Sequence, residues 1–560
     1  MRITRRRCLQ YSSSLFMAGL GWQLGEPIKG LGATERSKLD SLCPIDRGRD
    51  DGDRTVTGDE PHQAHTLLWS TQGGVNQLPK PDPAQLERVK VVVVGGGCAG
   101  LSAMWRLRDL KPVLLERASR LGGNARGETW RGLPYSIGAA YLVKPSDGSE
   151  IDKFLTEIGA KEALKVSHHE PIFMLKGAQG SESLKQLLTS SSAEERASWA
   201  RLMSALRDYA SETNGRRFPE LPTDNPPLRT MINQMDREPF SALCARLAGG
   251  PLAPWMQAYL EQYCWTAFGA GLSEVSSASG VNFLACELDE HLIGPGGNSW
   301  ITEQATRKLA STVGLDKLRP NSLVYHVEVT PEGVLVSYAD ANGATHQLLA
   351  ERAVLCCPKF VVKRILKGSE PERLEAISKL KYRAYTVHQA LLNVSLKDDF
   401  YELFLVGDHS GEASLDRRVQ ALSTGVTDLT YGNYAETSDK HTILSLYQAF
   451  PFDSGRAELY QDLSLSTHRA RVHERLRAEI LPALGVRPDA LQGLRSSRWG
   501  HPLPVASPTL IDQGVIDQLR APHKGRVFFA QQDNWALPAI EVSLYEGMRA
   551  ARDVRASLKR

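Results

Sequence analysis

The sequence predicts an α/β protein in which a Rossmann-like dinucleotide-binding domain is interleaved with an α+β domain. Three observations favour this fold class. Residues 91–94 form a continuous apolar run, typical of a buried parallel strand, and lead directly into a glycine-rich turn and an apolar helical segment. Some 400 residues later, residues 527–530 form another short apolar run after Arg526, followed by an amphipathic helical pattern. A chain of 560 residues is long enough for two large domains.

The composition excludes several classes of protein. With 42% hydrophobic and 23% charged residues, the chain matches an ordinary soluble globular protein. Its 67 Lys and Arg against 64 Asp and Glu give a net charge of +3, and no basic stripe follows the N-terminus, so nucleic acid is not an expected partner. The eight cysteines show no metal-binding spacing, so neither a disulfide framework nor a metal site is predicted.

Residues 1–33 have the order of a secretory signal: a basic segment, a weakly apolar stretch and small residues. The segment resembles a twin-arginine signal with Arg5 and Arg6 as the pair. This resemblance implies that the twin-arginine export machinery is a partner and that the folded protein reaches the periplasm with its cofactor in place. The apolar stretch is too short to span a bilayer, so we expect a soluble mature protein.

Residues 34–88 are predicted to be a disordered linker and lead-in. Charged side chains are dense between residues 34 and 60, and large apolar ones are few, so little apolar surface is available to offset the entropy of ordering. The first dinucleotide-binding segment is then expected over residues 89–150.

The glycine-rich turn after residues 91–94 has the spacing of a dinucleotide-binding motif. Gly95 permits the tight turn, Gly97 lets the backbone approach a pyrophosphate, and Gly100 lets the helix pack against the strand. The helix N-terminus then offers free N–H groups to the phosphates. A second apolar run ends at Glu116, about twenty residues after the first glycine, where a carboxylate can accept hydrogen bonds from ribose hydroxyls.

The residues after Glu116 separate the possible dinucleotides. Gly122 and Gly123 form a glycine pair, followed by Asn124 and Arg126. Here the sequence resembles the flavin amine oxidase superfamily, whose FAD-binding domain is of the two-dinucleotide-binding type. This resemblance implies FAD with the glycine pair along its flavin side. No residue of the kind that the family uses for covalent attachment is evident, so we expect the FAD to be non-covalent. The family usually has Arg directly after the pair; here Arg126 is the candidate for that charge.

The C-terminal segment, residues 501–560, resembles the last FAD-binding part of the same family. Asp533 stands where the family has an acid that binds the ribityl or phosphate portion of FAD. The helix that begins near Ile540 stands where the family directs a helix N-terminus at the flavin, which favours the negative charge of the reduced ring. Trp535 is a candidate for the aromatic wall on the substrate side.

The middle of the chain is divided by the same resemblance. Residues 151–290 carry helical patterns and are assigned to the substrate-binding domain. Residues 291–366 form the second FAD-binding part, with Val324 on a strand beside the adenine. Residues 367–500 return to the substrate-binding domain.

Two histidines are candidates for catalysis. His501 follows a tryptophan in the region where the family brings a residue over the flavin, and an imidazole titrates near neutral pH. Many family members carry a lysine beside flavin N5 on a substrate-domain strand. The corresponding segment here, residues 384–392, has no lysine, and His388 is its only imidazole. A fixed ammonium would favour the negative charge that forms on dioxygen when it accepts an electron. Without this ammonium, electron transfer to a quinone or a periplasmic carrier is expected to be faster than electron transfer to dioxygen.

These observations predict an FAD-dependent oxidoreductase of the amine oxidase or dehydrogenase type. It would oxidise a C–N bond of a small amine or amino acid by hydride transfer to flavin N5. Two alternatives stay open: a flavin desaturase or isomerase of an apolar polyene, and a flavin-binding partner protein without turnover. The fold by itself does not choose among them.

Overall fold

The structure is a computed structural model of the chain. It describes residues 33–48, 56–70, 74–167, 172–175, 182–183, 188–210, 221–223, 225–286, 290–396, 400–406 and 425–559. The twin-arginine pair Arg5 and Arg6 lies outside the described residues. Among the described helices, none combines the length and the apolar character that a membrane span needs.

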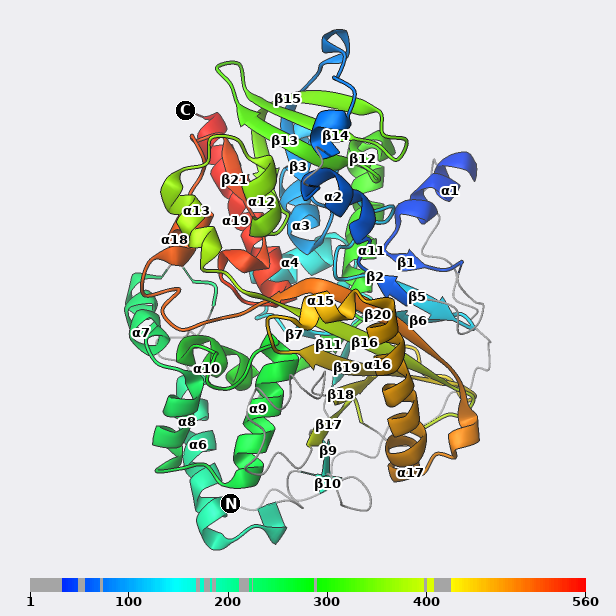
Figure 1. The fold of residues 1–560 in the computed structure, drawn as a ribbon, viewed down its shortest axis with the longest axis vertical. Helices are drawn as coiled ribbons and strands as arrows, with labels where there is room; N and C mark the ends of the chain where they lie inside the picture. Colours follow the sequence, from blue (N-terminus) through cyan, green and yellow to red (C-terminus); the bar gives the residue numbers. More distant parts are fainter. Residues whose placement is uncertain are drawn as a thin grey trace.

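A sheet of seven strands forms the centre of the dinucleotide-binding domain, drawn in the upper half of Figure 1. Its order is β12-β4-β3-β15-β14-β13, and β21 pairs with β15. Strands β12, β4, β3, β15 and β21 run parallel, whereas β13, β14 and β15 form an antiparallel meander. The strands are β3 (Glu87–Val94), β4 (Val113–Leu115), β12 (Leu318–Arg319), β13 (Leu323–Val329), β14 (Val334–Ala339), β15 (Thr345–Leu355) and β21 (Val527–Phe529).

Helices from both ends of the chain pack together on this sheet. Helix α3 contacts α19 and α11, and the contact with α19 is so close that a Cβ at Gly547 would lie 2.1 Å from Ser102 Oγ. The first and last dinucleotide-binding segments therefore share one core. The helices of this domain are α3 (Cys98–Arg106), α4 (Glu150–Glu157), α11 (Ser299–Val313), α12 (Lys359–Ile365), α13 (Pro371–Ser378), α18 (Val515–Arg520) and α19 (Ile540–Leu558).

The second domain contains an eight-stranded sheet of order β10-β9-β17-β18-β19-β16-β20-β2. Strand β16 pairs antiparallel with β19 and β20 along nearly its whole length. The strands are β2 (Val56–Gly58), β9 (Ile172–Leu175), β10 (Glu182–Ser183), β16 (Tyr382–Leu392), β17 (Glu402–Val406), β18 (Val426–Tyr431), β19 (Thr442–Phe450) and β20 (Leu491–Pro504).

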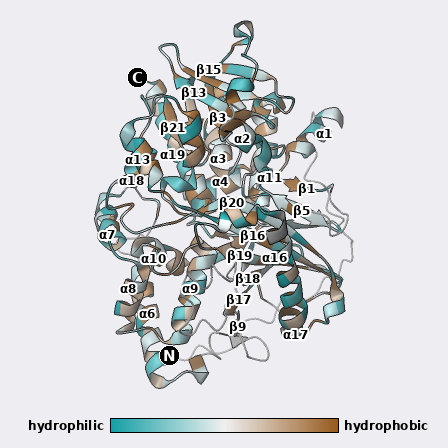
Figure 2. Cartoon of the chain, in the orientation of Figure 1, coloured by the Kyte–Doolittle hydropathy of each residue, from teal (hydrophilic) through white to brown (hydrophobic). Residues whose placement is uncertain are grey.

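Two sets of helices accompany this sheet, one at each side of it in Figure 1. Figure 2 shows the hydrophilic character of α16, whereas apolar residues are concentrated in β3. The first set is α6 (Ala193–Ala210), α7 (Pro226–Asp236), α8 (Phe240–Ala248), α9 (Pro254–Phe268) and α10 (Ser277–Cys286). The second set is α15 (Gly455–Leu459), α16 (Asp462–Arg475) and α17 (Leu481–Ala483).

Two small sheets join the domains. Strand β5 pairs with β1 and β6, and β11 pairs with β7 and β8. The predicted α/β fold, with a dinucleotide-binding domain interleaved with an α+β domain, is confirmed. The strands of the small sheets are β1 (Ile45–Asp46), β5 (Gly127–Trp130), β6 (Leu133–Ser136), β7 (Leu142–Val143), β8 (Lys165–Ser167) and β11 (His291–Ile293).

The prediction of a disordered linker over residues 34–88 is wrong for the residues described there. Helix α1 (Ala33–Leu42) buries Leu39 and Leu42 in the dinucleotide-binding core, together with Cys43. Strand β2 joins the second sheet beside β20, and α2 (Pro61–Leu68) follows it. This segment has few apolar side chains, but those of α1 point inward. Their burial offsets the conformational entropy lost on ordering, which the composition had predicted to keep the segment disordered.

Candidate functional site

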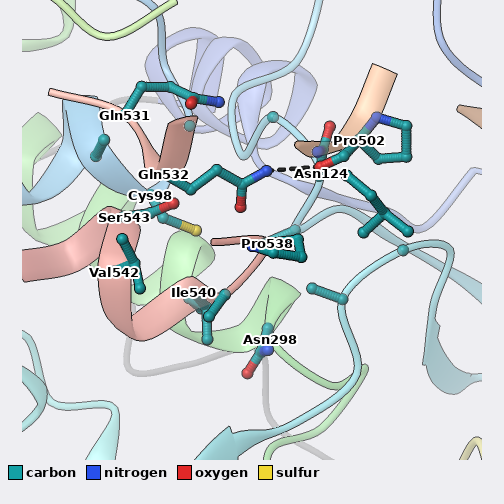
Figure 3. Close-up of a pocket in the computed structure, with 18 of the residues that line it drawn as sticks. Cys98, Asn124, Asn298, Pro502, Gln531, Gln532, Pro538, Ile540, Val542 and Ser543 are labelled. Atoms are coloured by element: carbon teal, nitrogen blue, oxygen red, sulfur yellow. Dashed lines mark hydrogen bonds between the residues drawn. The ribbon is translucent and has the colours of Figure 1, made fainter. Parts of the chain in front are cut away.

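A cavity of about 950 Å³ extends from the glycine motifs into the second domain. Figure 3 shows part of its wall, where the first turn of α19, with Ile540, Val542 and Ser543, lies beside Cys98 at the start of α3. Of the predicted cofactor-binding residues, the following line the cavity: Gly95, Gly97, Glu116, Gly122, Gly123, Arg126, Val324 and Ile540.

The glycine motifs meet as main chain. Gly97 forms a bridge to Gly122, and a Cβ at Gly123 would lie 3.0 Å from Gly97 Cα. Gly123 also has φ +60°, a conformation that glycine tolerates best. Gly100 packs α3 on the turn, since a Cβ there would lie 1.9 Å from Gly95 O, and it does not line the cavity. This cradle leaves room for a ligand to contact peptide N–H groups directly.

Glu116 is fixed at the end of β4. Its Oε2 accepts from Gly96 N at 2.7 Å and its Oε1 from Ala118 N at 2.8 Å. The residue is 8% exposed and faces the cavity. A carboxylate oriented in this way can accept from ribose hydroxyls, and Val324 on β13 supplies an apolar wall nearby in the same cavity.

Arg126 brings positive charge to the cavity wall. Its Nη1 donates to Glu60 Oε1 at 3.2 Å, its Nη2 donates to Gly58 O, and its guanidinium lies 5.3 Å from the ring centre of Trp499. Its buried Nε has no hydrogen-bond partner among the described residues. A phosphate or flavin oxygen could accept a hydrogen bond from this N–H. The N–H groups of the glycine turn, the carboxylate and this cation therefore fit a flavin dinucleotide.

Asp533 does not contact the cavity, which corrects its predicted role as a direct ligand. Lys359 N and Nζ donate to its two oxygens at 2.7 and 2.9 Å, and Tyr382 OH donates at 2.7 Å. Lys359 and Asp533 are both fully buried. The neighbouring glutamines Gln531 and Gln532 line the cavity instead.

Trp535 is also displaced from the predicted substrate wall. Its ring is 1% exposed within the core between the helices and the C-terminal segment, and its Nε1 donates to Glu546 Oε1 at 3.0 Å. The guanidinium groups of Arg229 and Arg520 lie 5.2 and 5.0 Å from its ring centre. The indole has a structural role there and does not line the cavity.

His388 faces away from the cavity because side chains alternate along β16. Tyr385 and Val387 line the cavity, so His388 lies on the opposite face. There it is hydrogen-bonded to Ser496 Oγ at 2.8 Å and to Gln448 Oε1 at 3.1 Å. Burial lowers its pKa to about 4. The prediction of a catalytic role for His388 is wrong.

His501 does line the cavity, close to Pro502, whose carbonyl accepts from Gln532 Nε2 at 2.6 Å (Figure 3). Its ring lies 4.3 Å from that of Phe360, and Arg456 donates to its Nε2. Burial, with a smaller effect of Arg456, lowers the pKa of His501 to about 4. The imidazole is therefore neutral at neutral pH, which removes the reason for expecting it to act as an acid.

Several side chains in the part of the cavity inside the second domain were not singled out from the sequence. Tyr385 on β16 and Tyr447 on β19 place their ring centres 6.1 Å apart. Burial, then Asp428, raises the pKa of Tyr385 well above its ordinary value, so this phenol stays protonated. Period-two alternation on the predicted strand at residues 384–392 is the signal that could have found Tyr385.

Two carboxylates share this part of the cavity. Asp428 on β18 is 1% exposed, and the hydroxyls of Thr427 and Thr266 donate to its Oδ1 at 2.8 and 2.9 Å. Glu402 on β17 is 9% exposed and lines the same cavity, as does Phe404. Carboxylates among aromatic rings form a region suited to a cation.

The sequence profile of the flavin-containing amine oxidoreductases matches residues 98–555. The chain belongs to this family. It is also similar to oxidoreductase PigB of Serratia sp. (strain ATCC 39006), with 20% identity over 519 residues, covering 84% of this chain and 75% of that protein. FAD is therefore its cofactor, and the protein is an FAD-dependent oxidoreductase, as the sequence predicts.

Solved structures have the same fold. A putrescine oxidase bound to putrescine is 17% identical, covers 84% of this chain and 99% of its own, and has a TM-score of 0.60. Cyclohexylamine oxidase from Brevibacterium oxydans IH-35A gives 17% identity, 84% and 100% coverage and a TM-score of 0.60. A fatty acid isomerase from P. acnes gives 14% identity, 82% and 97% coverage and a TM-score of 0.58.

Proposed function

We propose that this oxidoreductase oxidises the C–N bond of a small amine that binds as a cation. The observation that carries the proposal is the pair of buried carboxylates, Asp428 and Glu402, in the cavity beside Tyr385 and Tyr447. Their charge favours an ammonium group, and the two ring faces add a cation–π attraction. The putrescine and cyclohexylamine oxidases that share the fold are consistent with this substrate class.

FAD, when bound, supplies a hydride acceptor at flavin N5. This chain's residues hold the cofactor through the glycine cradle and Glu116, and they hold the substrate in the aromatic part of the cavity. Thr266 and Thr427 fix the Asp428 carboxylate, so the substrate's position is set before reaction. Hydride transfer requires the neutral amine, so the ammonium proton must first pass to a base, and the carboxylates of Asp428 and Glu402 are the bases in this part of the cavity.

A desaturase or isomerase of an apolar polyene remains the alternative. The fatty acid isomerase of the same fold supports it, as do the apolar side chains of Phe283 and Phe404 in the cavity wall. Two carboxylates in an apolar tunnel would be costly for such a ligand, because its hydrocarbon chain offers them no partner. This cost favours the amine.

The experiment that tests the proposal is anaerobic reduction of the purified holoenzyme. Primary amines, diamines, amino acids and unsaturated fatty acids are mixed separately with the oxidised protein, and loss of the flavin absorbance is followed. Bleaching by cationic amines is expected. Bleaching by no amine, together with double-bond shifts in the fatty acids, would establish the alternative.

We further propose that a quinone or a periplasmic carrier accepts the electrons faster than dioxygen. Of the β16 residues, those that line the cavity are Tyr385 and Val387, so this strand directs no ammonium group into it. Stopped-flow mixing of reduced enzyme with dioxygen or with a soluble quinone measures the two rates. A faster reaction with dioxygen would refute this proposal.

Export is the last part of the proposed function. The resemblance of residues 1–33 to a twin-arginine signal supports periplasmic delivery of the folded flavoprotein. Replacing Arg5 and Arg6 by Lys is expected to retain the protein in the cytoplasm with FAD bound. Unchanged delivery would exclude this export route.

A further inference from the structure

A segment ahead of the family-matched region lies along the cofactor side of the cavity. We call residues 56–69, which comprise β2 and α2, the N-terminal strap. The strap precedes residues 98–555, which the family profile matches. Its residues that line the cavity are Asp59, Pro61, Ala64, His65, Leu68 and Trp69.

The first end of the strap is attached to β20, next to Trp499 and His501. Strand β2 pairs in parallel with β20, and Asp59 N donates to Arg498 O at 2.8 Å. The Asp59 carboxylate accepts from Gly500 N at 2.6 Å and from Tyr460 OH at 2.9 Å. This end therefore lies beside the wall that carries His501.

The second end of the strap reaches the opposite end of the dinucleotide site. The Trp69 ring centre lies 6.2 Å from the ring centre of Phe360, and the Arg364 guanidinium lies 5.9 Å from the Trp69 ring centre. Leu68 packs against the apolar cluster that includes Val324 of β13. The strap thus extends along the cavity from β20 to the strand where the adenine wall was predicted.

The middle of the strap holds two arginines of the dinucleotide-binding domain. Arg126 donates to Glu60 Oε1 and to Gly58 O, so two of its three guanidinium nitrogens are held by the strap. Arg117, which follows Glu116 directly, donates to Glu60 O at 2.7 Å. The strap therefore fixes the cation that borders the cofactor site and covers that site at the same time.

We propose that the N-terminal strap is the outer wall of the FAD site and slows release of FAD from the folded protein. FAD cannot leave toward the strap while the β2 pairing and the Arg126 contacts are intact, so release requires the strap to move first. The structure assigns Glu60 and Gly58 as positioning residues: they act on FAD through Arg126 and through the attachment to β20.

Two substitutions test the strap without touching the glycine cradle. Gly58 has φ +99°, and a Cβ there would lie 2.2 Å from Arg498 O, so Gly58→Ala separates β2 from β20. We expect FAD release to become at least about tenfold faster. Glu60→Gln keeps the side-chain size and removes a half-exposed ion pair, for which about threefold faster release is expected.

Each substitution has a matched control elsewhere in the domain. Gly343→Ala introduces the same kind of backbone strain at φ +79°, where a Cβ meets nothing within 4 Å. Glu332 lies on the turn of the β13–β14 hairpin, and Glu332→Gln removes its exposed ion pair with Arg88. Neither control residue lines the cavity, so FAD release should stay at the parent rate.

The measurement uses full-length holoenzyme, and release of FAD is followed by the rise in flavin fluorescence after dilution. Circular dichroism and the thermal unfolding midpoint of the FAD-free forms check the fold. This readout needs no substrate, so it is separate from the proposed amine oxidation. Faster FAD release in both strap variants, with release at the parent rate in both controls, supports the proposal. Parent-like release in the strap variants, or equal acceleration in the controls, would overturn it.

Discussion

The dinucleotide half of the cavity is made largely of main chain, whereas the half inside the second domain is made of side chains. Gly97 and Gly123 approach each other through backbone atoms, and each belongs to a short motif that is continuous in the sequence. Tyr385, Asp428 and Tyr447 instead come from three strands of one sheet. The glycine cradle is therefore encoded by short local motifs, whereas the half inside the second domain depends on tertiary structure.

The largest effect is expected for a side chain added to the main-chain half. Gly123→Val places a branched side chain on a residue with φ +60°, and its Cβ would lie 3.0 Å from Gly97 Cα. The affinity for FAD should therefore fall at least about a hundredfold. Gly132→Val is the matched control, because Gly132 has φ +78° with nothing within 4 Å of a Cβ. Equilibrium dialysis with FAD measures both. Equal loss in the control would show that strain alone is responsible.

A second substitution separates a structural acid from a cofactor ligand. Asp533→Asn leaves the buried Lys359 ammonium without its charged partner, so the free energy of unfolding of the FAD-free protein should fall by about 3 kcal/mol. Because Asp533 does not line the cavity, the folded fraction should bind FAD within about threefold of the parent affinity. Asp316→Asn, at an exposed pair with Lys317, is the control. Normal stability with weak FAD binding would restore the direct role.

The side-chain half responds differently. Asp428→Asn should lower kcat/KM for a cationic amine by about tenfold or more, since a charge-assisted contact of about 1.5–3 kcal/mol is lost. The absorbance spectrum and affinity of bound FAD should not change, because Asp428 lies on β18 in the second domain. Steady-state kinetics with the amine identified by bleaching provide the test, and the exposed Asp439→Asn is its control. An unchanged kcat/KM would remove Asp428 from the substrate site.

The smallest effect concerns acid stability. The pKa of buried His388 is lowered from 6.5 to about 4, so between these values the unfolded chain binds more protons than the folded protein. The free energy of unfolding therefore rises with pH in this window, and the contribution of His388 to it is lost as the pH falls. His388→Gln should reduce the loss between pH 7 and pH 5 by about 1–2 kcal/mol. Urea unfolding at both pH values measures it, with His326→Gln as the control.

Much of the dinucleotide site was predictable because its signals are local. A buried strand, the glycine spacing from Gly95 to Gly100 and the acid at Glu116 together define one βαβ unit. The neighbouring pair Gly122 and Gly123 was likewise found in the sequence, and the structure brings it against Gly97. Each of these features depends on residues a short distance apart.

Predictions that depended on which way a side chain points were less successful. Asp533 and Trp535 lie on the predicted segment, yet both turn into the core, where Lys359 and Glu546 bind them. His388 lies on the predicted strand, yet on its other face. A shift of one residue in strand register moves every side chain to the other face of the sheet. Composition alone does not identify the neighbouring residues that would fix the register.

The sequence by itself determined the dinucleotide-binding fold, the FAD cofactor and the family, because short motifs dictate backbone shapes that few other residues can adopt. Only the tertiary structure decided that the segment before residue 70 lines the cavity and that Asp428 joins Tyr385 and Tyr447 there. Those contacts join residues far apart in the chain, and their positions follow from sheet pairing and burial across the whole molecule.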